Sequence, residues 1–414
     1  MLRRLGARAF AGLCLAVGAM ISAAAAEEPR PAAPYAVAPG LFDPSRPDLG
    51  LEAAPGTETF TIFAPTEATD RFSNGVVLIP FKERLYAMWQ ASARDEDSAD
   101  THVVYSTSQD GERWSAPVVL VPPGDRGWMY SSGGWMTDGD TLVAYANVWP
   151  EGFQSGAGGY AEYRTSTDGV NWSGPRHVMG ADGWPVEGVI EQDPHVYGRR
   201  VHTAFHMRPG MIAQPWFTDD PLGVVGWRQG LFENLPRDAS AAAAEHEKRL
   251  SREIEPSLFR RRGGCLVMVF RDEELSFRQI ASESCNRGAT WSTPVLTDMP
   301  DSRAKQSAGN LPDGTAYIVN APNSDRPRMP LAVTLSDDGR RFDRSFLLRG
   351  QGDLQPLRFE GQYKRPGYHY PKSVVWNGYL YVGYATNKED VQVTRVPLAS
   401  LRRQNQPASL STGP

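Results

Sequence analysis

The sequence predicts an all-β protein, a six-bladed β-propeller built from four-stranded antiparallel blades. Three observations lead to this prediction: a boxed polar turn that recurs along the chain, glycine turns between apolar runs, and the spacing of both. The boxed turn follows the pattern Ser-x-Asp-Gly-x-x-Trp and begins at Ser108, Ser166 and, with Phe in the last place, Ser336. Altered copies begin at Thr218 and Ser284, so that successive starts lie 58, 52, 66 and 52 residues apart. Self-similarity at such a period indicates a repeat architecture.

Tight glycine turns recur between the boxed turns. They lie at Asp138-Gly139, Tyr197-Gly198, Gly263-Gly264, Asp313-Gly314 and Asn377-Gly378. Such turns join hairpin strands, because the primed turn types need positive φ. Each repeat therefore contains four antiparallel strands, which is the composition of a propeller blade.

The expected inner strands give the number of blades. They begin near Gly75, Gly134, Asp193, Pro256, Ala308 and Pro371, which makes six blades. The last blade lacks a boxed turn, and we expect the segment "TFTIFAP" near residue 60 to close the ring around it. Seven blades would follow if residues 30–60 contained another.

The boxed turns themselves are expected to be structural. An Asp carboxylate can accept backbone N–H bonds within its own turn, and the Trp can pack on the neighbouring sheet. Such side chains use their hydrogen-bonding groups within their own loop, so they are not available to a ligand.

Residues 1–26 have the pattern of a secretory signal peptide: a basic start, an apolar run, and Ala24 and Ala26 at an A-x-A cleavage site. An uncleaved membrane anchor is the alternative. We expect an N-terminal extension over 27–58, a single propeller domain over 59–400 and a C-terminal tail over 401–414. The protein would then be periplasmic or secreted, with no membrane span after cleavage.

The charge balance excludes several partners. Loss of Arg3, Arg4 and Arg8 with the leader takes the basic residues from 43 to 40 against 48 acidic ones, a balance of −8. An acidic chain is a poor partner for nucleic acid or an anionic membrane. Motifs for phosphate loops, serine hydrolases, zinc proteases and redox cysteines are missing from the sequence, so we expect no cofactor or metal. We also expect a monomer.

The strand order places the inner-strand starts and the loops between second and third strands on one face. This funnel face carries Arg208 and Arg271 at the ends of successive apolar strands, with Arg328 in the next blade's loop. Arginines around one axis indicate an anionic ligand, because the guanidinium fork suits a carboxylate or sulfate. Function is expected on this face.

The boxed turns "STSQDGERW", "STDGVNW" and "SDDGRRF", with "EPSLFRRRGGCLVMVFRD" and "YPKSVVWNGYLYVGYA", resemble the sialidase superfamily of Asp-box propellers over nearly the whole mature chain. Boxed turns indicate fold rather than activity. The resemblance implies a secreted exo-glycosidase acting on an anionic sugar of a glycan. It matches Tyr370 to the nucleophile, Glu255 to its base, and Arg271 and Arg328 to carboxylate-binding arginines.

The resemblance also implies an acid and further contacts. Asp95, Asp97 or Asp100 would be the general acid. A neutral phenol suits a sugar with a carboxylate on its anomeric carbon, because it approaches without charge repulsion, but a base must take its proton. The sequence departs from the family in one place, where Asn74 stands at the position of the first arginine and Arg71 lies three residues too early.

Two other functions fit the same face. A polysaccharide lyase or a rhamnose-releasing enzyme acting at a uronate would use His206, His369 or Tyr370 as base and Arg208 or Arg271 as cation. A non-catalytic carbohydrate-binding propeller would stack tryptophans on sugar faces. The remaining candidate substrate-binding residues on this face are Asn74, Glu191, Asp193 and Trp149.

Two local features complete the sequence predictions. The insertion over 237–255, between the third and fourth blades, is rich in alanine and charge and predicts a short helix from about Ser240 that walls or lids the site beside Glu255. Cys265 and Cys285 are placed to face each other across one hairpin, either as a disulfide or as two buried thiols.

Overall fold

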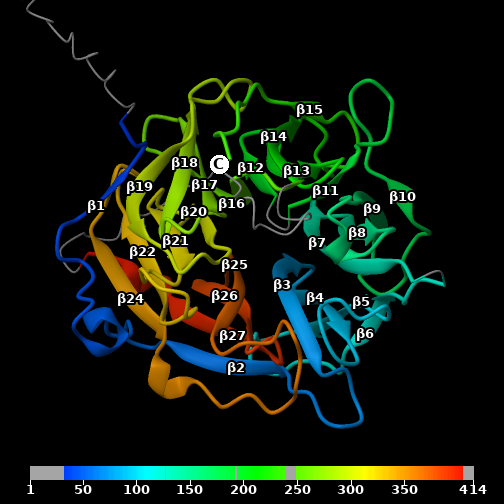
Figure 1. Ribbon diagram of the computed structural model, residues 1–414, viewed down its shortest axis with the longest axis horizontal. Helices are drawn as coiled ribbons and strands as arrows, with labels where there is room; N and C mark the ends of the chain where they lie inside the picture. Colours follow the sequence, from blue (N-terminus) through cyan, green and yellow to red (C-terminus); the bar gives the residue numbers. More distant parts are fainter. Residues whose placement is uncertain (1–31, 126, 192–193, 238–248, 404–414) are drawn as a thin grey trace, which may run out of the picture. The chain divides into compact units, whose positions relative to one another are not determined.

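The computed structural model describes residues 32–125, 127–191, 194–237 and 249–403. Within the compact unit Ala33–Pro414, six antiparallel sheets surround a common axis (Figure 1). Hydrophobic clusters join each sheet to the next, including the sixth to the first, so the ring is closed. The predicted six-bladed propeller is confirmed, and residues 32–60 contain no seventh blade.

The first three blades cover the first half of the chain. Blade 1 contains β3 (Phe72–Phe81), β4 (Arg84–Ser92), β5 (His102–Ser108) and β6 (Val118–Val121). Blade 2 contains β7 (Met129–Thr137), β8 (Leu142–Trp149), β9 (Tyr160–Ser166) and β10 (Arg176–His177). Blade 3 contains β11 (Gly188–Ile190) and β12 (His195–Tyr197), which both pair with β13 (Arg200–Met207), then β14 (Ile212–Thr218) and β15 (Arg228–Gln229).

The last three blades complete the ring. Blade 4 contains β16 (Glu253–Arg260), β17 (Leu266–Asp272), β18 (Arg278–Ser284) and β19 (Val295–Pro300). Blade 5 contains β20 (Ser307–Asn310), β21 (Ala316–Asn320), β22 (Leu331–Ser336) and β24 (Arg344–Arg349). Blade 6 contains β25 (Tyr368–Trp376), β26 (Tyr379–Thr386), β27 (Asp390–Pro397) and, as its outer strand, β2 (Glu58–Phe63).

The outer strand of blade 6 comes from the start of the propeller. Strand β2 pairs with β27 from Glu58 opposite Arg395 to Phe63 opposite Val391, so the segment near residue 60 closes the ring as expected. A parallel pair of β1 (Ala36–Val37) and β23 (Arg341–Phe342) ties the N-terminal extension to blade 5. Short 3₁₀ turns lie at Pro47–Gly50, Phe153–Ser155, Gln351–Asp353 and Leu398–Leu401.

The boxed turns have the predicted structural role. Asp110 Oδ1 accepts the backbone N–H groups of Glu112 and Arg113 at 2.9 Å each, and Ser108 Oγ accepts that of Gly111 at 2.8 Å. Added side-chain atoms would not fit at Gly111, where a Cβ would come within 2.5 Å of the Tyr381 ring of blade 6. Each turn is therefore closed by its own hydrogen bonds and packs against the neighbouring blade.

The tryptophans of the boxes lie between blades. Trp172, at the end of the second boxed turn, packs against Tyr105 and Trp135, with ring centroids 5.9 Å away in both cases. Trp227, in the degraded copy, is buried in the cluster shared by blades 2 and 3. The prediction that these rings pack on the adjacent sheet is confirmed.

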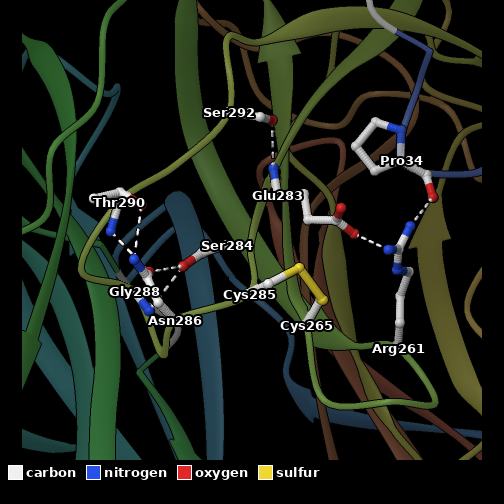
Figure 2. Close-up of a disulfide and its surroundings, with 10 residues drawn as sticks. All are labelled: Pro34, Arg261, Cys265, Glu283, Ser284, Cys285, Asn286, Gly288, Thr290 and Ser292. Carbon is white, nitrogen blue, oxygen red and sulfur yellow. Dashed lines mark hydrogen bonds and ion pairs between the residues drawn. A yellow bond between two sulfur atoms is a disulfide. The ribbon is translucent and has the colours of Figure 1, made fainter.

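Cys265 and Cys285 form a disulfide, with their Cα atoms 4.1 Å apart. The cause is the register of the hairpin, because Leu266 at the start of β17 lies opposite Ser284 at the end of β18. Figure 2 shows that the altered boxed turn follows directly, with Asn286 Oδ1 accepting the Thr290 backbone N–H at 2.9 Å in place of an aspartate.

The predicted helical insertion is not found in the described residues. Residues 238–248, which include Ser240, lie outside them. At the end of the segment, Leu250 forms a bridge to Met211, and strand β16 begins at Glu253, so strand pairing replaces the helix there. The helix propensity of the alanines does not extend to these residues. Within the described ranges, no helix has the length and apolar character that a membrane crossing requires.

Candidate functional site

Four inner strands begin with a β-bulge at the funnel face, and in two of them, β16 and β25, the bulge contains a residue other than glycine at positive φ. In β16 the register with β17 shifts between Ile254 and Ser257, and in β25 the register with β26 shifts between His369 and Lys372. The bulged residues Glu255 and Tyr370 have φ of 51° and 55°, in the left-handed region that side chains other than glycine avoid. Such backbone strain is concentrated at functional sites, and a bulge redirects the side chain that it carries.

Two cavities meet at these residues. The first has a volume of about 190 Å³ and the second about 240 Å³, and both are lined by Glu96 and Tyr370. Uncharged side chains prominent in the lining of the first cavity are Asn74, Gln90, Ser131, Asn147, Trp149 and Phe153. The cations that line the second are Arg271, Arg303, Arg326, Arg328, Arg365 and Lys388. A ligand at Tyr370 would thus place one part beside the carboxylates and uncharged side chains of the first cavity and another among the cations of the second.

The side chains of Tyr370 and Glu255 interact, and this interaction helps to lower the pKa of Glu255. Burial and the negative charge of Glu255 raise the pKa of Tyr370 well above its ordinary value. Burial alone would raise the pKa of Glu255 as well, but the charges of Arg271 and Lys305 outweigh it and hold that pKa below the usual range. The pair therefore consists of a neutral phenol and an ionised carboxylate that can take its proton.

Arg271 is held by two carboxylates. Its Nη1 lies 2.9 Å from Glu255 Oε2, and its Nη2 lies 2.7 Å from Glu273 Oε1. Arg303 forms an ion pair with the other oxygen of Glu273. Burial would lower the pKa of Arg271, but Glu273 and Glu255 raise it overall. This arginine is a fixed positive charge beside the nucleophile candidate.

Arg328 is oriented by a buried histidine. Arg328 Nη1 donates to His369 Nδ1 at 3.0 Å, and His369 Nε2 donates to the Arg365 carbonyl at 2.9 Å. His369 is fully buried, and burial with the charge of Arg328 holds its pKa well below 6.5. The imidazole is therefore neutral, with the proton on Nε2, and both nitrogens are used in positioning.

The ring of Tyr370 contacts two cations. Lys305 Nζ lies 5.3 Å and the Arg328 guanidinium carbon 5.6 Å from the ring centroid. Both distances are within the range of a cation–π interaction. These contacts restrict the ring position and place positive charge where a phenolate would develop.

Glu96 connects blade 1 to blade 6. Its Oε2 lies 2.6 Å from Lys388 Nζ, and its Oε1 accepts a hydrogen bond from Asn74 Nδ2 at 3.3 Å. Lys388 is buried, and its pKa is lowered by that burial although Glu96 opposes the effect. Asn74, where the resemblance expects an arginine, thus contributes an amide and no charge.

A buried charged group lies at the base of the first cavity. Glu191 forms an ion pair with Lys305 and lies 3.7 Å from Lys372 Nζ and 4.0 Å from His206 Nδ1. His206 Nε2 accepts the backbone N–H of Glu255 at 3.0 Å, so its proton belongs on Nδ1. Burial lowers the pKa of His206. This histidine holds the strained backbone of Glu255 and has no free lone pair for a substrate proton.

Several predicted residues lie elsewhere. Asp95 accepts the backbone N–H groups of Glu96 and Tyr363, and Asp100 accepts that of Ala93, so both stabilise their own loop region. Asp97 is exposed and lines neither cavity. The acid of this loop that lines both cavities is Glu96.

Two arginines considered for the funnel also lie outside both cavities. Arg208 lies 3.6 Å from Glu187 and pairs with that carboxylate. Arg71 lies 3.3 Å from Glu67 at the edge of blade 1. Trp149 lines the first cavity, with Nε1 donating to Ser131 at 3.0 Å, whereas Asp193 lies outside the described residues.

Sequence reasoning missed seven charged residues that line these cavities: Glu96, Glu273, Arg303, Lys305, Arg326, Arg365 and Lys388. Glu96 and Lys388 occur in the polar loops "SARDEDSAD" and "TNKED" after second strands, which the strand order already assigns to the funnel face. Their contact depends on the closure of blade 6 against blade 1, which no local pattern records.

The chain was compared with known proteins. No match was found among curated protein sequences. A solved structure described as a sialidase is 17% identical, with a TM-score of 0.62, and the match covers 88% of this chain and 35% of that one. A protein of unknown function from Dyadobacter fermentans is 16% identical, with a TM-score of 0.61. That match covers 82% of this chain and 99% of the other. A Hadza microbial sialidase is 13% identical, with a TM-score of 0.62. That match covers 83% of this chain and 69% of the sialidase.

These structural similarities concern the fold. The chain spans about a third of the length of the first sialidase, and identities below 20% carry no residue roles. The family profile described as BNR repeat-like domain matches residues 83–382, which run from blade 1 to blade 6. The boxed turns, the closed ring of six sheets and this match together show that the chain belongs to the BNR repeat-like domain family and has a sialidase-like propeller fold.

Proposed function

We propose that the protein is a glycoside hydrolase that removes an acidic sugar from the end of a glycan, with Tyr370 as the nucleophile. The observation that carries this proposal is the interaction of the Tyr370 side chain with the Glu255 carboxylate, beside a second cavity in which cations outnumber carboxylates. The sugar body occupies the first cavity, and its anionic group occupies the second, between Arg271 and Arg328.

The first step forms a covalent intermediate. Tyr370 Oη attacks the anomeric carbon while Glu255 takes the phenol proton, and the glycosidic bond breaks with its electron pair moving to the leaving oxygen. Glu96 donates a proton to that oxygen.

The second step releases the sugar. Glu96, now ionised, takes a proton from a water molecule that attacks the anomeric carbon, and the bond to Tyr370 Oη breaks. The phenolate recovers its proton from Glu255. Two displacements at one carbon retain its configuration. The negative charge that develops on Tyr370 Oη is stabilised by three cations, Arg271, Arg328 and Lys305.

The geometry gives less support to the lyase alternative. His206 and His369 were the candidate bases, but both are buried, neutral and engaged at their ring nitrogens. Tyr370 would remain as the only base of the three. A binding propeller would use the same cavities but would not need a strained Tyr370 beside an ionised Glu255.

The experiment incubates purified protein with sialosides and with uronate-containing oligosaccharides, following reducing ends and absorbance near 235 nm. We expect new reducing ends without new absorbance, and a loss of at least about a thousandfold in kcat/KM in Tyr370→Phe. Tyr379→Phe, on the far end of β26, is the matched control and should keep full activity. New absorbance near 235 nm would establish a lyase activity instead. If no substrate gave a product, the protein would be a carbohydrate-binding protein and the proposal would be wrong.

We also propose secretion or periplasmic export with cleavage after Ala26, on the basis of the leader pattern in residues 1–26. The mass of the protein recovered from culture medium or periplasm tests this. A mature chain that retains Met1 would contradict it.

A further inference from the structure

The second cavity contains more positive charge than a single carboxylate can neutralise. Six cationic side chains line it, against the carboxylates of Glu96 and Glu273. Glu255 adds a third negative charge from the adjacent cavity through Arg271. Three positive charges thus remain without a compensating carboxylate before any ligand is considered.

The uncompensated cations are arranged at two depths. Arg328 is buried at the base of the cavity beside Tyr370, whereas Arg326 and Arg365 are exposed at its rim. Within the described ranges, none of the three has a carboxylate within ion-pair distance. The other three cations differ, because Arg271, Arg303 and Lys388 each pair with a glutamate.

The base of the cavity is electrostatically unfavourable when empty. Burial lowers the pKa of Arg328, and the positive charge of Arg271 lowers it further. Like charges at close range repel most strongly where water is excluded. An anion at the base relieves this repulsion, but one carboxylate there still leaves the rim arginines without a partner.

We propose that the substrate is an acidic sugar with two anionic groups, one bound at the base by Arg271 and Arg328 and a second, a sulfate, phosphate or further carboxylate, bound at the rim by Arg326 and Arg365. The guanidinium fork suits each of these oxyanions. This inference rests on the proposed function in taking a sugar as the ligand, and it names the class of that sugar.

The test measures binding rather than turnover. Isothermal titration calorimetry on the Tyr370→Phe protein compares N-acetylneuraminate with its 8-O-sulfate, and methyl glucuronide with its 2-O-sulfate. We expect the sulfated member of at least one pair to bind at least tenfold more tightly. In the Arg326→Gln/Arg365→Gln protein this preference should fall below threefold, while the affinity for the unsulfated sugar changes by less than threefold.

A matched control separates local binding from long-range attraction. Arg113→Gln/Arg340→Gln removes the same charge from the exposed boxed-turn face and should leave the preference unchanged. The inference is overturned if neither sulfated sugar binds more tightly than its parent, or if the preference survives the loss of Arg326 and Arg365. A preference for sulfate without any hydrolysis would count against the proposed function alone.

Discussion

Both the boxed-turn face and the cavity face contain acidic side chains, but these side chains find their partners in different ways. In a boxed turn the carboxylate of Asp110 is satisfied by N–H groups two and three residues later. At the cavities some partners come from different blades, as when Glu96 of blade 1 meets Lys388 of blade 6. A turn that satisfies itself leaves nothing for a ligand, whereas charges assembled across blades can remain in excess.

The two faces also differ in where positive φ occurs. The boxed turns place it at glycines such as Gly111, with φ 76°, at no steric cost. The cavity face places it at Glu255 and Tyr370, where a side chain makes it costly. Glu255 and Tyr370 occupy bulges whose counterparts in β3 and β7 contain Gly75 and Gly134, and this contrast makes the following expectations testable.

After Tyr370, the largest effect is expected from Arg328. Arg328→Gln removes a buried cation that no carboxylate within the described residues neutralises, and we expect kcat/KM to fall by about a hundredfold. Arg113→Gln, which removes an equal charge from a boxed turn, should change kcat/KM by less than twofold. Steady-state kinetics on the substrate found above measures both. Equal losses in the two variants would show that net charge, and not the cavity, matters.

His369 should have a smaller effect, because it acts through Arg328. His369→Ala removes the acceptor of the Arg328 hydrogen bond, and we expect KM to rise about tenfold while kcat changes less than threefold. His369→Asn, which restores an acceptor oxygen, should recover part of the loss. A fall in kcat with KM unchanged would instead indicate a direct role in the chemistry.

The pH profile tests the charge balance around Glu255. Its pKa is held below the usual range, so the carboxylate stays ionised as pH falls through about 4.3, the ordinary value for glutamate. Lys305→Met removes one of the cations responsible, which should raise that pKa and move the acid limb of kcat/KM upward by about one pH unit. Thermal melting at each pH separates this shift from unfolding. An acid limb that does not move would exclude Glu255 as its origin.

The smallest effect on activity is expected from a boxed turn. Asp338 accepts the backbone N–H groups of Arg340 and Arg341 at 2.8 and 3.2 Å, and Asp338→Ala should lower the free energy of unfolding by about 1–2 kcal/mol. Activity should stay within twofold. Denaturant unfolding measures the change, with Asp140→Ala, an exposed hairpin aspartate, as control. A boxed-turn variant with normal stability and lost activity would contradict the division between the two faces.

Much of the fold could be predicted because its determinants are local. The boxed turn contains its own hydrogen-bond partners within about five residues, so the pattern beginning at Ser108 reveals the turn directly, and repetition then gives the blade count. The disulfide is nearly as local, because one hairpin register brings Cys265 opposite Cys285. The predicted helix over 237–255 was wrong for the part of this segment that the structure describes at its C-terminal end, because strand pairing along β16 outweighs helix propensity there.

The candidate site was predicted only in part. The resemblance assigned roles to Tyr370 and Glu255, and the structure brings them into contact. It could not distinguish Arg208 from Arg271, because both follow apolar strands. The structure places Arg271 in the second cavity beside Glu255, whereas Arg208 pairs with Glu187 and lines neither cavity.

The sequence by itself determined the repeating unit, its number and the face on which polar loops gather, since each depends on contacts within a few residues or one hairpin. Only the tertiary structure decided which charges share a cavity. Glu96 and Lys388 are 292 residues apart and meet because the last blade closes against the first. The same closure gathers the cations of four loops around Tyr370, and the electrostatic excess that results belongs to the ring and to no single segment.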